Sequence, residues 1–516
     1  MNQSHLTIAE LFEGISLAAP LTAELATRVS TGVHFDSRRI QPGFLFFAFS
    51  GANVDGRTFA AKAIESGAVA IVSELPPLPG LESGLESVWI QVTNARKALA
   101  LIGRRIHQDL TTNKLALFGV TGTNGKTTTA YILAAILKAA GFNTGLFGTI
   151  EYRIGDRTLN SVNTTPESIE LYDHFEELLE GADQDSPGQN SAVAMEVSSH
   201  ALALGRVWGM HFVAAIWTNL TRDHLDFHGD MDHYFAAKCE LFEGQQATPP
   251  AVAAINFDDA YGRRVPVHPA SKLWSFALNP NSPPTTVRAI NIRSGFDGVS
   301  FDLVTPLGTQ EIHSRMLGDV NVSNILAAAS ATLGHGIPLE AVRQGILNCH
   351  SVPGRFERVD SGQPFLTIVD YSHTDDAIRN AIRVARALKP SRVITLFGCG
   401  GDRDRAKRPL MGAAAAEASD YVVLTSDNPR TEDPISIMND ALVGLRRFDT
   451  PHTIEPDREK AIHKAIALAR PGDILILAGK GHEDYQIVGK TKFPFDDRVV
   501  ARRALAALGY EKEIPA

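Results

Sequence analysis

A short glycine-rich run, residues 119–128 (Gly-Val-Thr-Gly-Thr-Asn-Gly-Lys-Thr-Thr), constrains the fold of this chain more than any other stretch. The mostly apolar residues 114–120 predict a buried strand, and the residues after the run show the apolar spacing of a helix. A strand, a glycine-rich turn and a helix that begins at a Lys-Thr pair are the setting of a phosphate-binding P-loop. The strict G-x-x-x-x-G-K pattern fails at Val120. Because Gly119 and Gly122 flank that position, we interpret the run as a variant P-loop.

The residue types in this run suit a bound nucleotide. Glycines let backbone N–H groups turn toward an oxyanion, and a helix N-terminus adds partial positive charge. Lys126 can reach the β- and γ-phosphates, and the Thr127 hydroxyl can bind Mg²⁺. An ordinary glycine-rich turn with a solvated lysine is the alternative. The predicted ATP-binding residues of the run are Gly122, Thr123, Asn124, Gly125, Lys126, Thr127 and Thr128.

Composition indicates an ordinary soluble protein of about three domains, since the chain has 516 residues, 44% hydrophobic and 21% charged. A net charge of −9 argues against a nucleic-acid-binding surface. The three cysteines lie far apart and show neither a disulfide framework nor metal-ligand spacing, which favours a reducing compartment. We see no signal peptide and no apolar run long enough to span a membrane, so we expect a cytoplasmic protein without membrane insertion.

Three α/β blocks follow one another along the chain. Residues 1–110 predict a smaller N-terminal α/β domain, and residues 111–350 predict a central P-loop domain with a mainly parallel sheet. Residues 351–516 contain four apolar strands, each followed by a polar loop, which is typical of a Rossmann-like sheet. We interpret residues 181–190 and 278–286, rich in Gly, Pro, Asn and Ser, as surface loops.

Polar residues gather after the predicted strands of the central block. The segment Asn163-Thr164-Thr165-Pro166 follows an extended stretch, Glu196 ends a strand, and residues 219–226 follow another. Open α/β sheets bind ligands at these carboxyl ends. A carboxylate that leaves a strand beside a P-loop is well placed to bind Mg²⁺, so we expect this role for Glu196.

Three further positions are less obvious. Lys238 lies in a helical stretch with apolar neighbours, where a lysine usually extends its ammonium to water. Asn321 and Asn324 are three residues apart and share a helix face. They could contact one planar ligand together, or they could simply cap the helix.

The loops of the terminal blocks also carry polar groups. Residues 36–38 and 51–57 lie next to predicted strands, where ligands are often bound, although ordinary turn chemistry explains them equally well. The loops of the C-terminal block carry both charge signs, which suits a zwitterionic ligand, and salt bridges within the loops are the alternative. These charged residues are Arg403, Asp427, Arg430 and Glu483.

Six motifs together resemble the Mur ligases of bacterial cell-wall synthesis. They are Gly-Thr-Asn-Gly-Lys-Thr-Thr, Asn-Thr-Thr-Pro, Glu-Val-Ser-Ser-His, Asn-Leu-Thr-Arg-Asp-His-Leu-Asp, Gly-Arg-Phe-Glu and Asp-Tyr-Ser-His. The resemblance covers nearly the whole chain, in family order, and is strongest to the MurE branch. Members of that branch add the third residue of the peptidoglycan stem peptide to UDP-N-acetylmuramoyl-L-alanyl-D-glutamate. The resemblance implies a UDP-binding N-terminal domain, a central ATPase and a mobile Rossmann-like C-terminal domain.

The resemblance also implies a role for each candidate residue. Those that would bind the UDP-muramoyl-dipeptide are Ser37, Ala52, Asn53, Val54, Asn163, Thr164, Thr165, Ser198 and Arg206. Those that would hold two Mg²⁺ ions are Thr127, Glu196, His224 and Lys238, the last as N6-carboxylysine, a carbamate formed with CO₂. Asn321 and Asn324 would lie near the adenine of ATP. Those that would bind the incoming amino acid are Arg403, Asp427, Asn428, Pro429, Arg430, Gly479 and Glu483. The implied catalytic residues are Lys126, Glu196, His224, Lys238, Arg355 and Asp370, of which Arg355 and Asp370 would bring the C-terminal domain onto the nucleotide.

Two positions depart from the family pattern. Leu204 stands where family members often have Gln, which puts one substrate hydrogen bond in doubt. Asp375 stands where they often have Pro.

The implied reaction is ATP-dependent amide-bond formation. ATP would activate the D-glutamate γ-carboxylate as an acyl phosphate, and an amine would then attack it. Residues 427–430 resemble the loop of the branch that uses meso-diaminopimelate rather than L-lysine. The alternatives are a lysine-adding ligase, another Mur or folylpolyglutamate-type ligase, and a non-catalytic P-loop binding module. We expect a monomer in the bacterial cytoplasm with no nucleic-acid partner.

Overall fold

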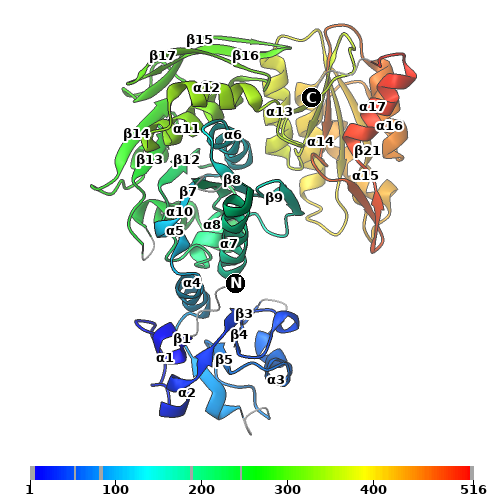
Figure 1. Ribbon diagram of the computed structural model, residues 1–516. Coiled ribbons are helices and arrows are strands. Elements are labelled where there is room, and N and C mark those ends of the chain that lie inside the picture. Colours follow the sequence, from blue (N-terminus) through cyan, green and yellow to red (C-terminus); the bar gives the residue numbers. More distant parts are fainter. Residues whose placement is uncertain (1–5, 52–53, 81–84, 186–189, 245–246, 512–516) are drawn as a thin grey trace. The chain divides into compact units, whose positions relative to one another are not determined.

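The computed structural model describes residues 6–51, 54–80, 85–185, 190–244 and 247–511. The chain divides into two compact units. The first comprises Met1–Arg288 and Leu326–Gly345, and the second comprises Ala289–Ile325 and Ile346–Ala516. Figure 1 shows both units coloured along the chain.

A small parallel sheet, in the order β3-β4-β5-β6, forms the N-terminal part of the first unit. Its strands are β3 (Gly32–His34), β4 (Phe44–Phe47), β5 (Ala70–Ser73) and β6 (Trp89–Gln91). Parallel strands covered on both faces are continuously apolar, and Leu45 and Phe46 indeed enter different hydrophobic clusters. The short elements around the sheet are β1 (Leu6–Thr7), α1 (Ile8–Leu11), α2 (Ala23–Thr27), β2 (Val29–Ser30), η1 (Ser37–Arg39), η2 (Gly56–Phe59), α3 (Ala60–Glu65) and η3 (Glu86–Val88). The longer helix α4 (Ala95–Ile106) begins at Asn94, whose side chain accepts the N–H of Lys97 at 2.9 Å.

The central part of the first unit contains the first eight strands of an 11-stranded sheet, in the order β10-β9-β8-β11-β7-β12-β13-β14. Its strands are β7 (Leu115–Thr121), β8 (Asn143–Phe147), β9 (Glu151–Ile154), β10 (Arg157–Asn160), β11 (Ser191–Glu196), β12 (Ala214–Trp217), β13 (Val252–Asn256) and β14 (Lys272–Ala277). Six of these strands run parallel to their neighbours, in the order β8, β11, β7, β12, β13 and β14, and β9 and β10 form an antiparallel edge. Strand β7 lies between β11 and β12, so Glu196 and Ile216 both lie beside Val120. The carboxyl ends of three strands therefore meet at the predicted P-loop.

Helices cover both faces of this sheet (Figure 1). The helices in this part of the chain are α5 (Leu110–Asn113), α6 (Lys126–Ala139), α7 (Ser168–Asp185), α8 (Ser199–Ala203), α9 (Leu225–His228), α10 (Met231–Glu243), the 3₁₀ helix η4 (Gly262–Arg264), α11 (Asp319–His335) and α12 (Leu339–Asn348). The prediction of a surface loop at residues 181–190 is wrong for residues 181–185, because α7 continues to Asp185. The apolar spacing that drives this helix ends near Leu178, and the polar last turn carries no such signal. Residues 186–189 lie outside the described residues.

The second unit is built on a six-stranded, mainly parallel sheet in the order β18-β19-β23-β20-β21-β22. Its strands are β18 (Glu357–Val359), β19 (Leu366–Asp370), β20 (Val393–Cys399), β21 (Tyr421–Ser426), β22 (His452–Glu455) and β23 (Ile474–Ala478). Its helices are α13 (Asp375–Ala387), α14 (Lys407–Ala418), α15 (Pro434–Leu445), α16 (Arg458–Leu468) and α17 (Asp497–Ala507). Further strands are β15 (Val287–Gly295), whose first residues pair with β14, the hairpin β16 (Gly298–Thr305) with β17 (Gly308–Ser314), and the hairpin β24 (Tyr485–Val488) with β25 (Thr491–Pro494).

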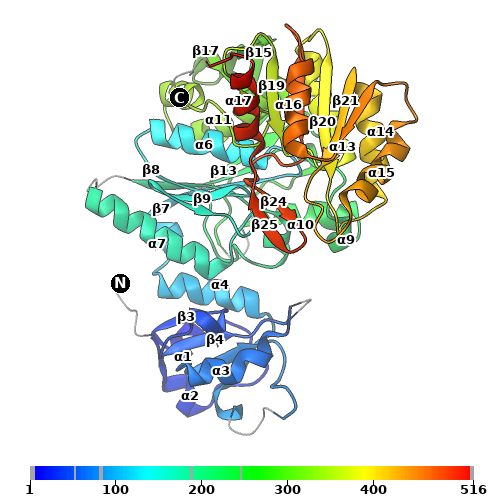
Figure 2. The ribbon, with the colours of Figure 1, turned by 90° about the vertical axis from the view of Figure 1, so that its right-hand side faces the viewer.

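Two hydrophobic clusters cover the two faces of this second sheet. Ile368 packs with residues of α13, α14 and α15, whereas its neighbour Val369 packs with residues of α16 and α17 (Figure 2). Successive residues of a strand point to opposite faces, so the sheet is doubly wound, as the four predicted strands indicated. The cysteines Cys239, Cys349 and Cys399 are free and buried. Within the described ranges, no helix combines the length and apolar character needed to cross a membrane.

Candidate active site

The loop between β7 and α6 has the backbone of a phosphate cradle. Gly122 and Gly125 have φ values of +142° and +87°, which residues with a Cβ rarely adopt. A Cβ at Gly122 would lie 1.9 Å from the hydroxyl oxygen of Thr218, so only glycine fits there. The N–H of Thr123 donates to the carbonyl of Asn219 at 2.8 Å, which ties the loop to the end of β12. The loop is therefore shaped by its own residues and by the neighbouring strand.

Two lysines meet on one carbonyl of this loop. Lys126 Nζ donates to Gly122 O at 3.0 Å and to Thr123 O at 2.8 Å. Lys238 Nζ, from α10, donates to the same Gly122 O at 2.8 Å. Lys238 is only 1% exposed, so the usual picture of a lysine that reaches water does not hold here. Burial lowers the pKa of the Lys238 amine well below its usual value, and the charge of Lys126 lowers it further.

Glu196 ends β11 beside the P-loop and is 1% exposed. Its carboxylate accepts the N–H of Thr149 at 2.8 Å and the hydroxyl of Thr149 at 3.2 Å. The Thr149 hydroxyl oxygen in turn lies 3.1 Å from that of Thr164. Asn163, the preceding residue, is fixed through its backbone, since its N–H and carbonyl both bond the Tyr152 hydroxyl. A carboxylate has about four lone-pair directions, so these two hydrogen bonds do not use all the acceptor capacity of Glu196.

His224 is the predicted metal ligand with the most open position. Its backbone is left-handed, with φ +52°, and its side chain is 45% exposed. Its ring centre lies 4.9 Å from that of His200. Burial lowers the pKa of His224, and the charges of Lys126 and Lys238 lower it further, while Asp223 opposes them. A neutral imidazole is the form that binds metals.

The predicted metal-binding residues mix a hydroxyl, a carboxylate, an imidazole and a lysine. In the part of the chain that the structure describes, no three or more His, Cys, Asp or Glu side chains gather to hold a metal ion. The metal role of Thr127, which is 6% exposed in the first turn of α6, therefore stays a prediction together with that of the other three residues.

Three predicted dipeptide-binding residues come together beside this site. The Thr165 hydroxyl donates to Glu196 O at 2.9 Å and accepts the N–H of Ser198 at 3.1 Å. Ser198 then caps α8. Arg206 Nη1 donates to Thr165 O at 2.9 Å, and its Nε donates to Glu167 at 3.0 Å. The sequence pattern did not indicate Glu167, which adjoins the predicted Asn-Thr-Thr-Pro segment.

The predicted UDP-binding residues are only partly described. Ser37 begins the turn η1 and is 8% exposed. Val54 is 56% exposed and lies in a loop closed by the N–H of Gly51, which donates to Val54 O at 3.1 Å. Ala52 and Asn53 lie outside the described residues.

In the second unit, the predicted pair Arg355 and Asp370 lies at the carboxyl end of β19. The Asp370 carboxylate accepts the N–H of Phe356 at 2.7 Å and the hydroxyl of Ser372. Burial raises the pKa of Asp370, and these hydrogen bonds and the charge of Arg355 act against that rise. The Arg355 guanidinium lies 5.1 Å from the ring centre of Tyr371. The structure thus brings both predicted residues to one strand end.

The predicted amino-acid-binding residues form a charged cluster around a buried lysine. Asn428 Nδ2 donates to Glu483 at 2.9 Å. Lys480 is fully buried, and its Nζ donates to Glu483 at 3.1 Å and to Asn428 Oδ1 at 3.3 Å. It also lies 4.0 Å from Asp427. A Cβ at Gly479 would lie 2.7 Å from the Asp427 carboxylate, so this close approach requires glycine. We did not predict Lys480, because a lysine in a polar loop ordinarily faces water.

Arg430 joins the same cluster through the loop after β20. Its Nη1 donates to Gly401 O at 2.8 Å, and its N–H donates to Ile487 O at 3.1 Å. Its φ is +51°, which is unusual for a residue with a side chain. A Cβ at Gly401 would lie 1.8 Å from Pro429 O, so the two loops pack backbone to backbone. Arg403 is exposed on the same loop, and its binding role stays a prediction.

Two buried arginines support this cluster, and the sequence analysis missed both. Arg458 and Asp497 are fully buried and pair at 2.6 Å, and Arg458 also donates to the last carbonyls of β21 and β23. Arg408 pairs with Glu432 at 2.7 Å and donates to Gly400 O at 3.3 Å. Arg458 stands among charged residues at the start of α16, and Arg408 follows a lysine at the start of α14, so neither carried a local signal of burial.

Asn321 and Asn324 share a helix face, as their spacing predicted. Asn324 Nδ2 donates to Asn321 Oδ1 at 3.1 Å, and Asn321 Nδ2 donates to Leu317 O at 2.9 Å. Both are nearly buried. Their contact with adenine stays a prediction.

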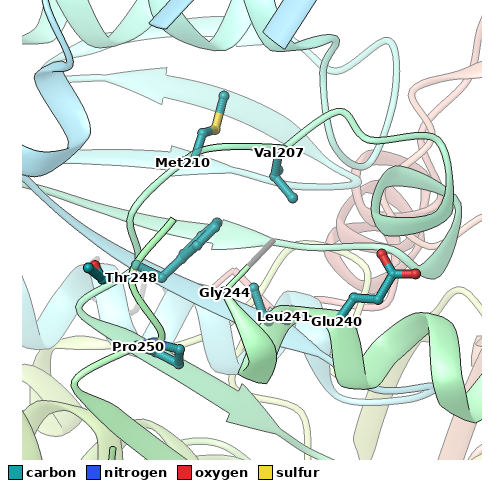
Figure 3. A pocket seen from close by; sticks show the side chains of 8 residues that line it. Val207, Met210, Glu240, Leu241, Gly244, Thr248 and Pro250 are labelled. Carbon is teal, nitrogen blue, oxygen red and sulfur yellow. The ribbon is translucent and has the colours of Figure 1, made fainter. Parts of the chain in front are cut away.

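A small pocket lies between α10 and the loop after α8 (Figure 3). Its lining is mostly apolar and lacks the converging polar groups of a ligand site. We therefore assign it no ligand. The lining residues are Val207, Met210, Phe212, Glu240, Leu241, Gly244, Thr248 and Pro250.

Comparisons with known proteins agree with this geometry. Residues 30–107 match the catalytic domain of the Mur ligase family, residues 120–332 the Mur ligase middle domain, and residues 354–481 the Mur ligase glutamate ligase domain. The chain is 54% identical over 507 residues to the UDP-N-acetylmuramoyl-L-alanyl-D-glutamate--2,6-diaminopimelate ligase of Solibacter usitatus, covering 98% of this chain and 100% of that one. The chain belongs to the Mur ligase family.

Other members of the Mur ligase family give the same picture. A relative with the same ligase name from Geobacter metallireducens is 42% identical, covering 93% of this chain and 95% of that one. A solved structure with that ligase name has a TM-score of 0.70 at 30% identity and covers 98% of this chain and 99% of its own. A MurF structure from Acinetobacter baumannii, with a TM-score of 0.61 at 20% identity and coverage of 98% and 99%, shows the shared fold alone. The predicted α/β fold of the Mur ligases is confirmed.

Proposed function

We propose that this chain is the ATP-dependent ligase that joins meso-diaminopimelate to the D-glutamate γ-carboxylate of UDP-N-acetylmuramoyl-L-alanyl-D-glutamate. The product is the UDP-muramoyl-tripeptide used in peptidoglycan synthesis. The observation that carries the proposal is the meeting of Lys126 and Lys238 on Gly122 O in a P-loop, one strand away from the buried Glu196. The names of the near-full-length relatives point to the substrates.

The P-loop residues would bind the phosphates of ATP. Lys126 now donates to two carbonyls of its own loop, and it would exchange these bonds for phosphate oxygens. Its charge would then stabilise the transferring phosphoryl group, because positive charge acts most where negative charge develops. ATP supplies the phosphoryl group that turns a poorly electrophilic carboxylate into an acyl phosphate. The amine attacks that carbonyl, a tetrahedral intermediate forms, and phosphate leaves.

The types of residue at these positions would suit two Mg²⁺ ions, which would neutralise charge on the phosphoryl group. Thr127 and Glu196 would hold one ion with hard oxygen ligands, and His224 with a modified Lys238 would hold the other. The modification proposed for Lys238 is a carbamate formed with CO₂. Two ammonium groups on one carbonyl repel each other, and an ammonium would also repel a nearby cation. A carbamate would remove that conflict and add two oxygen ligands.

Each unit would bind its own substrate: the first unit the UDP-muramoyl-dipeptide, and the second unit the amino acid. Thr165, Ser198 and Arg206 would bind the dipeptide, with the UDP moiety at Ser37 and the loop that carries Val54. In the second unit, the Lys480-centred cluster would bind the amino acid. Water would destroy an acyl phosphate, so a closed active site is part of the proposal.

The remaining parts of the proposal concern organisation. We propose three domains with boundaries near residues 110 and 350, a monomeric state, and a place in the bacterial cytoplasm. Asn321 and Asn324 would contact adenine, and Arg355 and Asp370 would act on the nucleotide.

The test is phosphate release from ATP by the purified chain. UDP-N-acetylmuramoyl-L-alanyl-D-glutamate would be offered with meso-diaminopimelate, L-lysine or D-alanyl-D-alanine, and a folate substrate would be offered with glutamate. We expect turnover with the first pair and formation of the UDP-muramoyl-tripeptide by mass spectrometry. Turnover with another pair alone would assign another ligase activity, and no turnover with any pair would favour a binding module.

A further inference from the structure

A continuous line of contacts joins the N-terminal loops of the first unit to Arg206. The Arg96 guanidinium, on α4, lies 4.4 Å from the ring centre of Phe49 and pairs with the carboxylate of Glu167. That same Glu167 oxygen accepts Arg206 Nε at 3.0 Å. One carboxylate therefore lies between two arginines, one from α4 and one from the predicted dipeptide site.

The N-terminal end of this line reaches both loops proposed to bind UDP. Phe49 directly precedes the loop that carries Val54, and its carbonyl accepts the N–H of Gly56 at 2.8 Å across the base of that loop. The Phe49 ring stacks on that of Phe35, with centres 5.9 Å apart. Phe35 lies two residues before Ser37. A movement of either loop would therefore move the Phe49 ring, and with it the guanidinium of Arg96 that lies against this ring.

The other end of the line is also held by α4. Lys97 Nζ lies 3.6 Å from the ring centre of Trp208, and a Cβ at Gly205 would lie 2.9 Å from Lys97 Cγ. Glu167 is 6% exposed, and the side chains of Arg96 and Arg206 are 25% and 15% exposed, so the three charges lie in a partly buried environment. Lys97 thus lies against residues on both sides of Arg206 in the sequence, and its neighbour Arg96 contacts the carboxylate that Arg206 shares.

We propose that Arg96 is a positioning residue that couples the UDP end of the substrate site to the dipeptide end. The inference rests on the proposed function, since it assumes that Arg206 binds the dipeptide. Two arginines share the Glu167 carboxylate, which leaves donors of Arg206 available to a substrate carboxylate. Without Arg96, Glu167 would pair with Arg206 alone and would compete with the substrate for it. The UDP loops would also lose the cation that rests on Phe49.

The test uses three variants of the full chain. Arg96→Met removes the charge and keeps the length, Arg96→Lys keeps the charge, and Arg28→Met is the matched control. Arg28 lies in the same N-terminal part, pairs with Glu24 at 2.6 Å and has a side-chain exposure of 30%, against 25% for Arg96. Affinities for UDP alone and for UDP-N-acetylmuramoyl-L-alanyl-D-glutamate would be measured by calorimetry, together with kcat and each KM.

We expect Arg96→Met to weaken binding of the full substrate about tenfold relative to binding of UDP, within the roughly 5- to 150-fold range typical of coupled sites. KM for ATP and the thermal midpoint should stay near those of Arg28→Met, and Arg96→Lys should recover most of the loss. In the Arg206→Met background, Arg96→Met should add little, because both act through one contact. Additive losses, or equal effects of Arg96→Met and Arg28→Met, would overturn the proposal.

The unmutated protein separates this inference from the proposed function. If it binds and ligates the UDP-muramoyl-dipeptide while Arg96→Met behaves like the control, the inference alone fails. If it binds UDP but neither binds nor turns over the UDP-muramoyl-dipeptide, the proposed function fails and the coupling is overturned with it.

Discussion

Arg430→Ala is expected to remove most of a preference for meso-diaminopimelate over L-lysine. The two amino acids differ at the far end, where only diaminopimelate carries a carboxylate. The Arg430 guanidinium donates once to Gly401 O, which leaves donors for a paired contact with that carboxylate. Loss of one partner from a buried charge pair costs about 2–5 kcal/mol. Since Gly401 O still satisfies one donor when lysine binds, we expect the lower part of that range, roughly 30- to 100-fold in discrimination.

The assay is phosphate release at saturating UDP-muramoyl-dipeptide, with kcat/KM for each amino acid. Arg430→Ala should reduce the diaminopimelate value toward the lysine value, and Arg430→Lys should recover part of it. Arg405→Ala is the control, because Arg405 belongs to the same unit, pairs with Asp440 at 3.1 Å and has a 64% exposed side chain. Equal use of both amino acids by the unmutated protein would refute the reasoning. An equal loss with both amino acids in Arg430→Ala would show that Arg430 only fastens the loop to Gly401.

Three further changes probe the rest of the machinery. Lys126→Ala should abolish ligation and leave the thermal midpoint unchanged, because its charge acts mainly on the transition state, and near-normal turnover would contradict the P-loop role. Lys238→Ala should be nearly inactive and partly restored by short-chain carboxylates, whereas a missing carbamate signal in ¹³C NMR with labelled bicarbonate would argue against the modification. Asp497→Asn should lower the free energy of unfolding in urea by about 3–5 kcal/mol, because it leaves Arg458 buried without its carboxylate, and a loss below about 1 kcal/mol would mean that the strand carbonyls suffice.

The parts of the site with local signals could be predicted from the sequence. The P-loop is recognisable because a strand, a glycine turn and a helix are each local patterns, and β7 and α6 follow them closely. Glu196 was found because it ends an apolar strand, and the register of β11 places it beside Val120. The spacing of Asn321 and Asn324 likewise predicted their shared face.

The parts built from long-range contacts could not be predicted this way. Glu167 meets Arg96, which is 71 residues away, and nothing near either residue marks the pair. Lys480 lies in a loop whose polar residues suggest solvent, yet the carboxylate of Glu483 and the amide of Asn428 enclose it. The apolar neighbours of Lys238 indicated that the aliphatic part of its side chain would be buried. They did not indicate that its amine would be buried too, because the acceptor, Gly122 O, comes from the distant P-loop.

His34 makes a pH-dependent contribution to the N-terminal part of the first unit. It is 3% exposed, and its Nδ1 accepts the N–H of Asp36 at 2.8 Å, which requires that nitrogen to be unprotonated. Burial lowers the pKa of His34 from 6.5 to about 4, with a further lowering by Arg39 and an opposing effect of Asp36. In the unfolded chain, His34 therefore binds a proton below about pH 6.5, whereas in the folded chain it binds that proton only below about pH 4.

The free energy of unfolding should thus fall as the pH drops from about 6.5 to about 4, and the His34 contribution should be constant above and below that window. At about 1.36 kcal/mol per pKa unit, the full loss is about 3 kcal/mol. His34→Asn keeps an acceptor near the position of Nδ1 and does not titrate, so urea unfolding of both proteins between pH 7 and pH 4 isolates the effect. The variant should lose less stability than the unmutated protein across this window, and parallel curves would show that His34 does not control it. Because Asp36 caps the turn that begins at Ser37, the same acidification should raise KM for the UDP substrate in the unmutated protein more than in the variant.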